Sequence, residues 1–337
     1  MGGRRSFADR ERLAGVARAA LGPRRRIAEV ARLRGGSKKG VYRLTLDDGA
    51  SVIVYIWDSA ENYWPDSPQA PEGAAGRADP FSHASGIDLF VAAERRLTAV
   101  GVRTPRILLA DTSRDHYPAD VAVVEDVRGA TLEELLRSDP RGATPVVHRL
   151  AASLGAMAEY DGAPGFGKVA VVDNGGAPHG GSCEQAVLDR ALDDLLEAAR
   201  RDERIGAVRD ELEDLVRGWF AAIRPRERFA VVHGELGPDH VLVDDRGRPV
   251  LVDIEGLMYF DVEWEHAFLR IRFADHYPPL HRAGMDEQRL RFYALAMRLS
   301  LVAGPLRLLD GDFPDRDFML GIVEHNLQES LAFLGRR

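Results

Sequence analysis

Three side chains with the chemistry for handling phosphates lie close together in the sequence: Glu235, His240 and Asp253. Phosphoryl transfer needs one group that orients the attacking hydroxyl and further groups that hold a magnesium ion against the phosphates. The residues around them form apolar runs that are interrupted by two short polar loops. This pattern predicts buried strands joined by tight turns, and such a hairpin brings the three side chains to one rim.

The string at residues 233–243 resembles the catalytic and metal-binding loops of the aminoglycoside phosphotransferase family, which has the protein-kinase-like fold. The usual family string is His-Gly-Asp-Leu-His-Pro-Gly-Asn, followed by an Asp at the end of a strand. This chain carries Glu235 in place of the catalytic Asp and His240 in place of the magnesium-binding Asn. Histidine also occupies the second position in the related macrolide phosphotransferases. The resemblance implies that Asp253 is the principal magnesium ligand.

The same resemblance gives roles to the neighbouring residues. Glu235 is expected to be the catalytic base, although its extra methylene displaces the carboxylate, and a misplacement of roughly 1 Å can cost on the order of 100-fold in rate. His233, which belongs to the same catalytic loop, is expected to fix the loop's shape and not to transfer a proton. Glu255 is a candidate second carboxylate for the metal. The alternatives are a surface glutamate at 235 and a core histidine at 240.

A glycine-rich loop lies between the first two strands expected in the chain, at residues 27–33 and 41–46. A third strand is expected at residues 51–57, so the pattern predicts a small antiparallel sheet. Backbone N–H groups in such a loop can cradle phosphates, although most glycine-rich turns are only turns. The predicted phosphate-binding residues of this loop are Gly36, Ser37, Lys38 and Lys39.

The strand expected at residues 51–57 has no lysine or arginine. In the resembled family, a lysine on this strand meets the nucleotide phosphates and pairs with a glutamate on the following helix. That helix is expected at residues 87–100, which makes Glu94 the corresponding glutamate. We hypothesise that Lys38 or Lys39 replaces the missing lysine. Glu94 then either orients that lysine or is an ordinary solvated helix charge.

The segment at residues 58–86 contains four prolines and reads as an irregular insertion, either a lid or a surface loop. Farther along, Glu125 to Val127 matches the family's hinge, whose backbone would contact the purine. This hinge divides the chain into residues 1–127, a nucleotide-binding lobe, and residues 128–337, a catalytic and acceptor-binding lobe. Thr131 and Glu134 form a capping-box pattern just after it. Further helices are expected at residues 146–160, 184–200, 207–223, 262–273, 285–301 and 313–334.

Composition narrows the class of protein. The net charge of −8 gives no field that would attract nucleic acid. Cys183 is the only cysteine, which excludes an intramolecular disulfide and fits a reducing cytoplasm. No signal peptide or membrane-spanning run is recognisable. The acidic run at residues 261–266 either lines an acceptor pocket or forms the first turn of a helix.

These observations predict an α+β, bilobal protein-kinase-like fold with a small antiparallel-sheet N-lobe and a mainly helical C-lobe. The resemblance implies a cytoplasmic small-molecule kinase that uses Mg²⁺ and ATP (or GTP) to phosphorylate a hydroxyl of an antibiotic-like or sugar-like acceptor. A monomer or homodimer without nucleic-acid or membrane partners is expected. The alternative is a nucleotide-binding pseudokinase with a regulatory role. A protein kinase is disfavoured, because the segment after Asp253 runs quickly into a helix.

Overall fold

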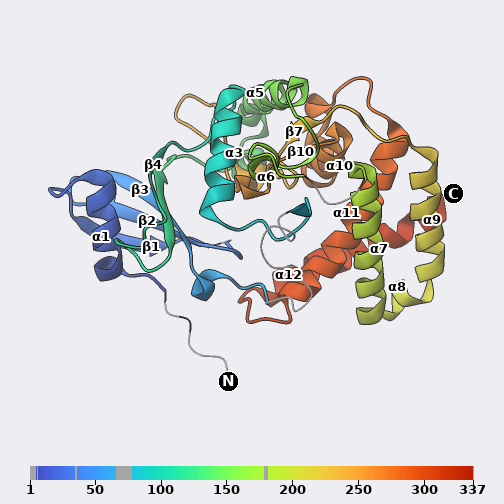
Figure 1. Cartoon of the computed structure of the whole chain (residues 1–337), viewed down its shortest axis with the longest axis horizontal. Helices are drawn as coiled ribbons and strands as arrows, with labels where there is room; N and C mark the ends of the chain where they lie inside the picture. The colour runs from blue at the N-terminus through green and yellow to red at the C-terminus, as the bar shows by residue number, and fades with distance from the viewer. Residues whose placement is uncertain (1–4, 6, 35, 66–77, 178–180, 337) are drawn as a thin grey trace.

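A computed structural model describes residues 5, 7–34, 36–65, 78–177 and 181–336 (Figure 1). One end of the molecule is an antiparallel sheet with a helix against it, and the rest is mainly helical. The α+β, two-part fold expected from the sequence is therefore confirmed. The predicted insertion at residues 58–86 lies partly outside the described residues.

The N-terminal sheet has five strands in the order β1-β2-β3-β5-β4, and each neighbouring pair is antiparallel. Its strands are β1 (Ile27–Arg32), β2 (Gly40–Leu46), β3 (Ser51–Trp57), β4 (Ile107–Asp111) and β5 (Asp120–Glu125). The three strands expected at residues 27–33, 41–46 and 51–57 agree with β1, β2 and β3 within one residue, because apolar side chains and the Asp47-Asp48-Gly49 turn mark them clearly.

The two faces of this sheet have different partners. Alternate residues of β3, among them Val54, point toward α1 (Arg10–Leu21) and form one apolar core with it. The residues between them, Ile53 and Tyr55, belong to a second core that also includes α3 (Ile87–Ala99) and residues of the C-terminal part. Since one core joins both parts of the chain, the division at residue 127 stays a prediction.

The catalytic segment is built from two small sheets and not from the single hairpin expected. Strand β7 (Ala230–Val232) pairs with β10 (Met258–Phe260), which in turn pairs with β6 (Gly167–Lys168). Strand β8 (Val241–Val243) pairs with β9 (Pro249–Leu251). The loop between β7 and β8 therefore passes from one sheet to the other. Strand β10 was missed because its three residues are too few to show a period.

The helices of the C-terminal part lie close to their expected positions. They are α4 (Leu132–Ser138), α5 (Pro140–Glu159), α6 (Val169–Val172), α7 (Cys183–Arg201), α8 (Glu203–Ala207), α9 (Arg209–Ala222), α10 (Val262–Phe273), α11 (Glu287–Leu308) and α12 (Arg316–Ala332). Helix α5 begins six residues earlier than expected, because Asp139 caps it and Pro140 occupies its first turn. The capping box of Thr131 and Glu134 is confirmed at the start of α4.

The connection from β5 to α4 is fixed by charge and by close packing. Asp126, whose side chain is buried, accepts two hydrogen bonds from Arg43 of β2 at 2.8 and 3.0 Å. Three residues later, a Cβ added to Gly129 would lie 1.8 Å from the Val243 carbonyl oxygen. The expected hinge is thus tied to the N-terminal sheet on one side and packed against β8 on the other.

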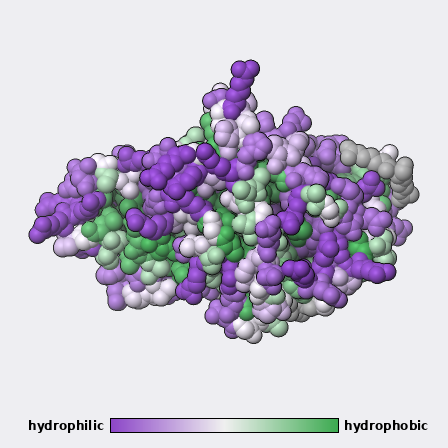
Figure 2. Space-filling view, turned by 90° about the horizontal axis from the view of Figure 1, so that it is seen from above, coloured by the Kyte–Doolittle hydropathy of each residue, from purple (hydrophilic) through white to green (hydrophobic). Residues whose placement is uncertain are grey.

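The surface seen in Figure 2 is mostly polar, and apolar side chains gather on it only in small patches. This agrees with a charged fraction of 29%. None of the helices in the described part of the chain is long and apolar enough to cross a bilayer.

Candidate active site

The loop between β7 and β8, residues 233–240, is held in shape from behind. Gly234 has a φ of +87°, and a Cβ there would lie 2.8 Å from Met258 Cε. The positive φ favours glycine here, and any larger residue would also have to displace the Met258 methyl group. The Gly234 N–H donates to Glu265 Oε2 of α10 at 2.8 Å. Burial raises the pKa of Glu265 to about 7, although the hydrogen bonds it accepts oppose the rise.

His233 lies behind the same loop and is buried. Its Nε2 is 3.0 Å from the Val252 carbonyl oxygen, at the end of β9. Burial and the neighbouring His240 lower the pKa of His233 to about 4, so the ring is neutral. The neutral His233 ring donates its Nε2–H to the Val252 carbonyl oxygen and so joins the two small sheets. This contact fits the structural role expected of His233.

Glu235 and His240 face the open side of the loop. The Glu235 side chain is exposed, and among the described residues its carboxylate has no hydrogen-bond or ion-pair partner. His240 Nδ1 lies 2.9 Å from the Glu235 carbonyl oxygen. When the ring is neutral, Nδ1–H donates this bond and Nε2 keeps its lone pair. That Nε2 lies 3.8 Å from Asp253 Oδ2, so the structure brings the imidazole and this carboxylate together.

Asp253 follows β9 in a left-handed conformation, with φ 58° and ψ 46°. A non-glycine residue rarely adopts this conformation, and such residues concentrate at functional sites. The Asp253 side chain remains 47% exposed. The positive charge of Lys39 holds its pKa far below the usual range, and His240 acts in the same direction. Asp253 is therefore ionised and open to solvent.

Lys39 supplies the cation that β3 lacks. Its Nζ lies 2.7 Å from Asp253 Oδ1 and 2.5 Å from Glu255 Oε1. The ammonium also lies 5.2 Å from the centre of the Tyr55 ring, which occupies the middle of β3. Burial opposes the charged form of Lys39, but the two carboxylates outweigh burial and raise its pKa. One ammonium ion thus joins the start of β2 to both acids.

Of the two candidate lysines, only Lys39 is brought to the acids. Lys38 is half-buried, and its Nζ lies 5.9 Å from the centre of the Trp64 ring. Gly36 precedes it in a tight turn, where an added Cβ would lie 2.6 Å from the Lys39 carbonyl oxygen. Ser37 Oγ accepts a hydrogen bond from Trp64 Nε1 at 3.0 Å. The glycine loop is therefore shaped by its own backbone and by the chain that follows β3.

Two other predicted nucleotide-binding side chains have partners outside this cluster. Glu94 accepts a hydrogen bond from Thr98 of its own helix at 3.1 Å, and the structure does not pair it with a glycine-loop lysine. The Glu125 carboxylate binds Arg103 at 2.8 Å. Lys39 is paired with Asp253 and Glu255, so of the two alternatives for Glu94 the structure favours the ordinary helix charge. Val127 is buried, and its contribution to a ligand would come from its backbone.

The hinge borders a hollow of about 340 Å³ that is lined by Arg43, Asp126, Arg128 and Gly129. Arg43 is paired across the sheet with Ile53, and Val41 with Tyr55. Paired residues of an antiparallel sheet lie on one face. The hollow and the Lys39 cluster therefore belong to the same side of the N-terminal sheet.

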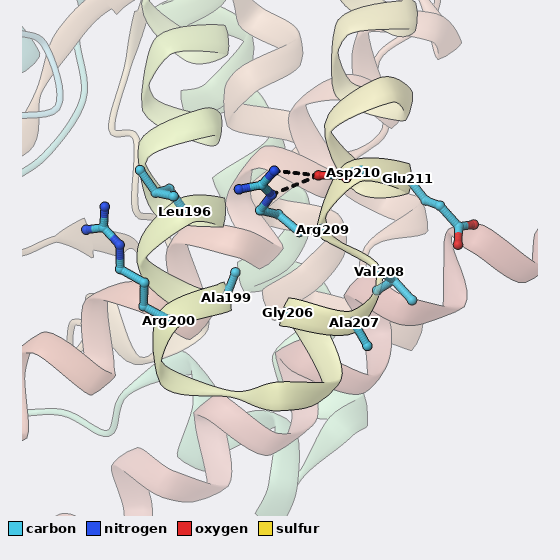
Figure 3. Close-up of a pocket in the computed structure, with 9 residues that line it drawn as sticks. All are labelled: Leu196, Ala199, Arg200, Gly206, Ala207, Val208, Arg209, Asp210 and Glu211. Carbon is cyan, nitrogen blue, oxygen red and sulfur yellow. Dashed lines mark hydrogen bonds and ion pairs between the residues drawn. The ribbon is translucent and has the colours of Figure 1, made fainter.

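A second hollow, of about 450 Å³, lies between α7, α8 and α9 (Figure 3). Its lining combines small and apolar residues with Arg209, which pairs with Asp210 at 2.6 Å. None of the residues predicted to act in catalysis lines it. It is therefore separate from the candidate active site.

Acids also cluster around Cys183, Glu184 and Asp261 in the buried C-terminal core. Arg289 already occupies this cluster, with its Nη1 2.6 Å from Glu184 and 2.5 Å from Asp261. The guanidinium ion neutralises the two carboxylates and so accounts for this buried cluster as an ion-pair network. Asp261 also caps α10 by accepting from the Glu263 N–H, so this acid belongs to a helix start and not to an acceptor pocket.

The chain belongs to the phosphotransferase enzyme family, whose model matches residues 29–301. This family membership makes it a phosphotransferase with an alcohol group as acceptor, within the class of small-molecule kinases. A search of curated proteins found no match.

Solved structures show the same fold at low sequence identity. The aminoglycoside phosphotransferase APH(4)-Ia, as a thermostable mutant without ligands, is 18% identical with a TM-score of 0.60, over 90% of this chain and 95% of that one. The aminoglycoside 2'-phosphotransferase-IIIa in its GDP complex is 15% identical with a TM-score of 0.60, over 96% and 99%. A putative fructosamine-3-kinase from Thermobifida fusca is 20% identical with a TM-score of 0.53, over 95% and 98%. These likenesses establish the protein-kinase-like fold.

Sequence reasoning missed two residues that shape the site. Glu265 was one acid in the run at residues 261–266, and its hydrogen bond to Gly234 depends on how α10 packs against β7. Trp64 lies in the proline-rich segment after β3, where the pattern gave no periodicity. The only signal for Trp64 was a large aromatic residue within an otherwise polar stretch.

Proposed function

We propose that this protein transfers the γ-phosphoryl group of ATP or GTP to a hydroxyl of a small acceptor, with Mg²⁺ as cofactor. One observation carries the proposal: the buried Lys39 ammonium joins Asp253 and Glu255 directly beside a catalytic loop whose Glu235 carboxylate is exposed and has no partner within the described part of the chain. A cation, two acids and an available carboxylate are the parts that phosphoryl transfer requires.

Lys39 is proposed to bind the nucleotide phosphates in place of a lysine on β3. Its ammonium lies over the Tyr55 ring, so the side chain reaches the cleft face of the sheet from the loop just before β2. A buried, fully charged lysine forms stronger bonds to phosphate oxygens than an exposed one does. The N–H groups around Gly36 and Ser37 would support the same phosphates.

The donor set suits magnesium. Asp253 and Glu255 offer carboxylate oxygens, the ligand type that Mg²⁺ prefers, and His240 presents the Nε2 lone pair on the same side. These three residues would hold the ion, which would supply neutralisation of the phosphate charge. The hydrogen bond from His240 to the Glu235 carbonyl fixes the ring orientation that this role needs.

Glu235 is proposed to accept a hydrogen bond, and then the proton, from the acceptor hydroxyl. Its carboxylate is exposed, while the backbone on both sides is held by Gly234 and by the His240 ring. A fixed backbone places the base, and positioning supplies most of the catalysis in this kind of reaction. The purine would contact the hinge backbone at Glu125 to Val127, beside the hollow at Arg43.

The nature of the acceptor is supported only by likeness. A structure of APH(4)-Ia holds AMP-PNP and hygromycin B, and one of APH(2")-IIIa holds GDP and kanamycin. We therefore propose an antibiotic-like or sugar-like molecule with several hydroxyl groups. Because one fold serves many substrates, the acceptor must be found by experiment.

The test is a screen of aminoglycosides, macrolides and sugars with ATP or GTP and Mg²⁺, in which acceptor mass is followed for the gain of one phosphoryl group. We expect one acceptor class to gain that mass with the wild type and not with Glu235→Gln. If Glu235→Gln keeps the full rate, the base assignment is wrong. Nucleotide-dependent thermal stabilisation without turnover on any acceptor would instead support the pseudokinase alternative.

A further inference from the structure

The chain just after β3 holds the glycine loop through one residue, Ser37. The Tyr63 N–H donates to the Ser37 carbonyl oxygen at 2.8 Å. The Trp64 indole Nε1–H donates to Ser37 Oγ at 3.0 Å. Both acceptor groups of Ser37 are therefore engaged by two consecutive residues of the same segment.

These two bonds determine what Ser37 offers to a ligand. A hydroxyl group has one proton and two lone pairs, and its proton normally rotates among several directions. Because the Trp64 indole is a donor only, the Ser37 hydroxyl must accept from it, and its own proton then points elsewhere. Ser37 thus presents donor groups, which suit an anionic oxygen such as that of a phosphate.

The same segment rests on the C-terminal part of the molecule. Tyr63 packs against Leu308 and Phe313, with ring centres 5.5 Å apart in the aromatic pair. Arg5 donates to the Ala60 carbonyl oxygen and to the Asn62 carbonyl oxygen, at 2.8 Å each.

Arg5 also pairs with Asp312, and a Cβ added to Gly311 would lie 2.8 Å from the Tyr63 carbonyl oxygen. Figure 1 shows the chain after β3 reaching the connection between α11 and α12. The glycine loop is therefore linked to that connection by residues 60–64.

We infer that Trp64 is a positioning residue for the nucleotide phosphates and acts through the Ser37 hydroxyl. The segment that carries Trp64 is in turn anchored on the connection between α11 and α12. This inference rests on the proposed function, since it needs a nucleotide at the glycine loop. The inference adds Trp64, which lies outside the glycine loop, to the residues that position the nucleotide. It also implies a mechanical link between the N-terminal sheet and the C-terminal helices. The position of α11 and α12 would then influence nucleotide affinity.

The first test replaces the indole without removing the aromatic ring. Trp64→Phe loses the N–H donor, and Ser37→Ala loses the hydroxyl that receives it. Trp57→Phe is the matched control, because its buried Nε1 has no hydrogen-bond partner in the described part of the chain. Dissociation constants are measured by calorimetry with Mg·AMP-PNP, or with the GTP analogue if the wild type prefers it.

We expect Trp64→Phe to weaken nucleotide binding about 2- to 12-fold, which corresponds to the ~0.5–1.5 kcal/mol of one hydrogen bond. Trp57→Phe should bind nucleotide as tightly as the wild type does. The kcat of Trp64→Phe should change little at saturating nucleotide. The double variant Trp64→Phe with Ser37→Ala should bind no more weakly than Ser37→Ala alone. Multiplicative losses in the double variant would overturn the inference, because they would mean that the two residues act separately.

The second test acts from the far end of the link. Gly311→Ala should push the Tyr63 carbonyl away and weaken nucleotide binding, although residue 311 lies in the connection between α11 and α12. Gly321→Ala is its control, because an added Cβ there meets nothing within 4 Å.

If Trp64→Phe and Gly311→Ala both bind the nucleotide as tightly as the wild type does, the inference is refuted and the proposed function stays intact. Absence of nucleotide binding by the wild type itself would refute both.

Discussion

Replacing Lys39 by methionine should lower the stability of the protein and increase the stabilisation that added Mg²⁺ produces. The ammonium ion is buried between Asp253 and Glu255, at 2.7 and 2.5 Å. Methionine has similar length but no charge, so the variant leaves two carboxylates facing each other without a counter-ion. Removing one partner of a buried ion pair costs about 3–5 kcal/mol.

The cost should fall toward the lower end of this range, since the Asp253 side chain is 47% exposed and water screens it. We expect a loss of about 3 kcal/mol, which lowers the melting temperature of a chain of this size by roughly 4 °C. Added Mg²⁺ should restore part of the loss, because the ion can take the ammonium's place between the acids. The wild type, whose acids are already neutralised, should respond less.

Nucleotide binding should weaken in the same variant. A charge-assisted hydrogen bond contributes about 1.5–3 kcal/mol, so the nucleotide KM should rise roughly 10- to 150-fold. Lys38→Met is the matched control, since Lys38 is half-buried and lies over Trp64 and not between the acids. Calorimetry with and without Mg²⁺ measures the first effect, and steady-state kinetics the second. The reasoning is refuted if Lys38→Met, and not Lys39→Met, shows these changes.

Three further substitutions test other parts of the site. Glu235→Gln should lower kcat by about 100-fold or more and leave nucleotide affinity unchanged, as measured by single-turnover kinetics beside calorimetry. Glu265→Gln should remove a pH dependence of stability. The Glu265 carboxyl group stays protonated up to about pH 7 in the folded protein but loses its proton near pH 4.5 in the unfolded chain. Wild-type stability therefore falls as the pH rises between these values. The variant should therefore gain about 3 kcal/mol over the wild type at pH 8 and nothing at pH 4, and an equal difference between the two proteins at both pH values would contradict this. Gly129→Ala should lose at least about 3 kcal/mol in urea unfolding, because its Cβ would meet the Val243 carbonyl oxygen at 1.8 Å, whereas Gly155→Ala, with open space around it, should not lose stability.

The sequence was a good guide wherever the signal was local. Strand β3 and helix α10 have the bounds expected, because alternation and helical periodicity are visible within each segment. The string at residues 233–243 pointed to the family, which the family model confirms over residues 29–301. It also placed Glu235, His240 and Asp253 in one loop system, since short turns leave such residues little freedom to separate.

The lysine beside the acids was decided only by tertiary structure. Lys38 and Lys39 are adjacent and chemically identical, and both precede β2, so the alternation of strand residues does not distinguish them. Lys39, one residue before β2, lies over the Tyr55 ring of β3 and bonds Asp253, which is 214 residues away in sequence. Glu94, expected either to orient a lysine or to be an ordinary helix charge, accepts a hydrogen bond from Thr98 of its own helix.

The sequence thus determined the fold, the family and the chemical types at the site. Contacts between distant segments decided which polar groups meet: Lys39 with two acids, Gly234 with Glu265, and Ser37 with Trp64. The physical reason is that helix and strand periods are set by neighbouring residues, whereas an ion pair or a side-chain hydrogen bond depends on how whole elements pack.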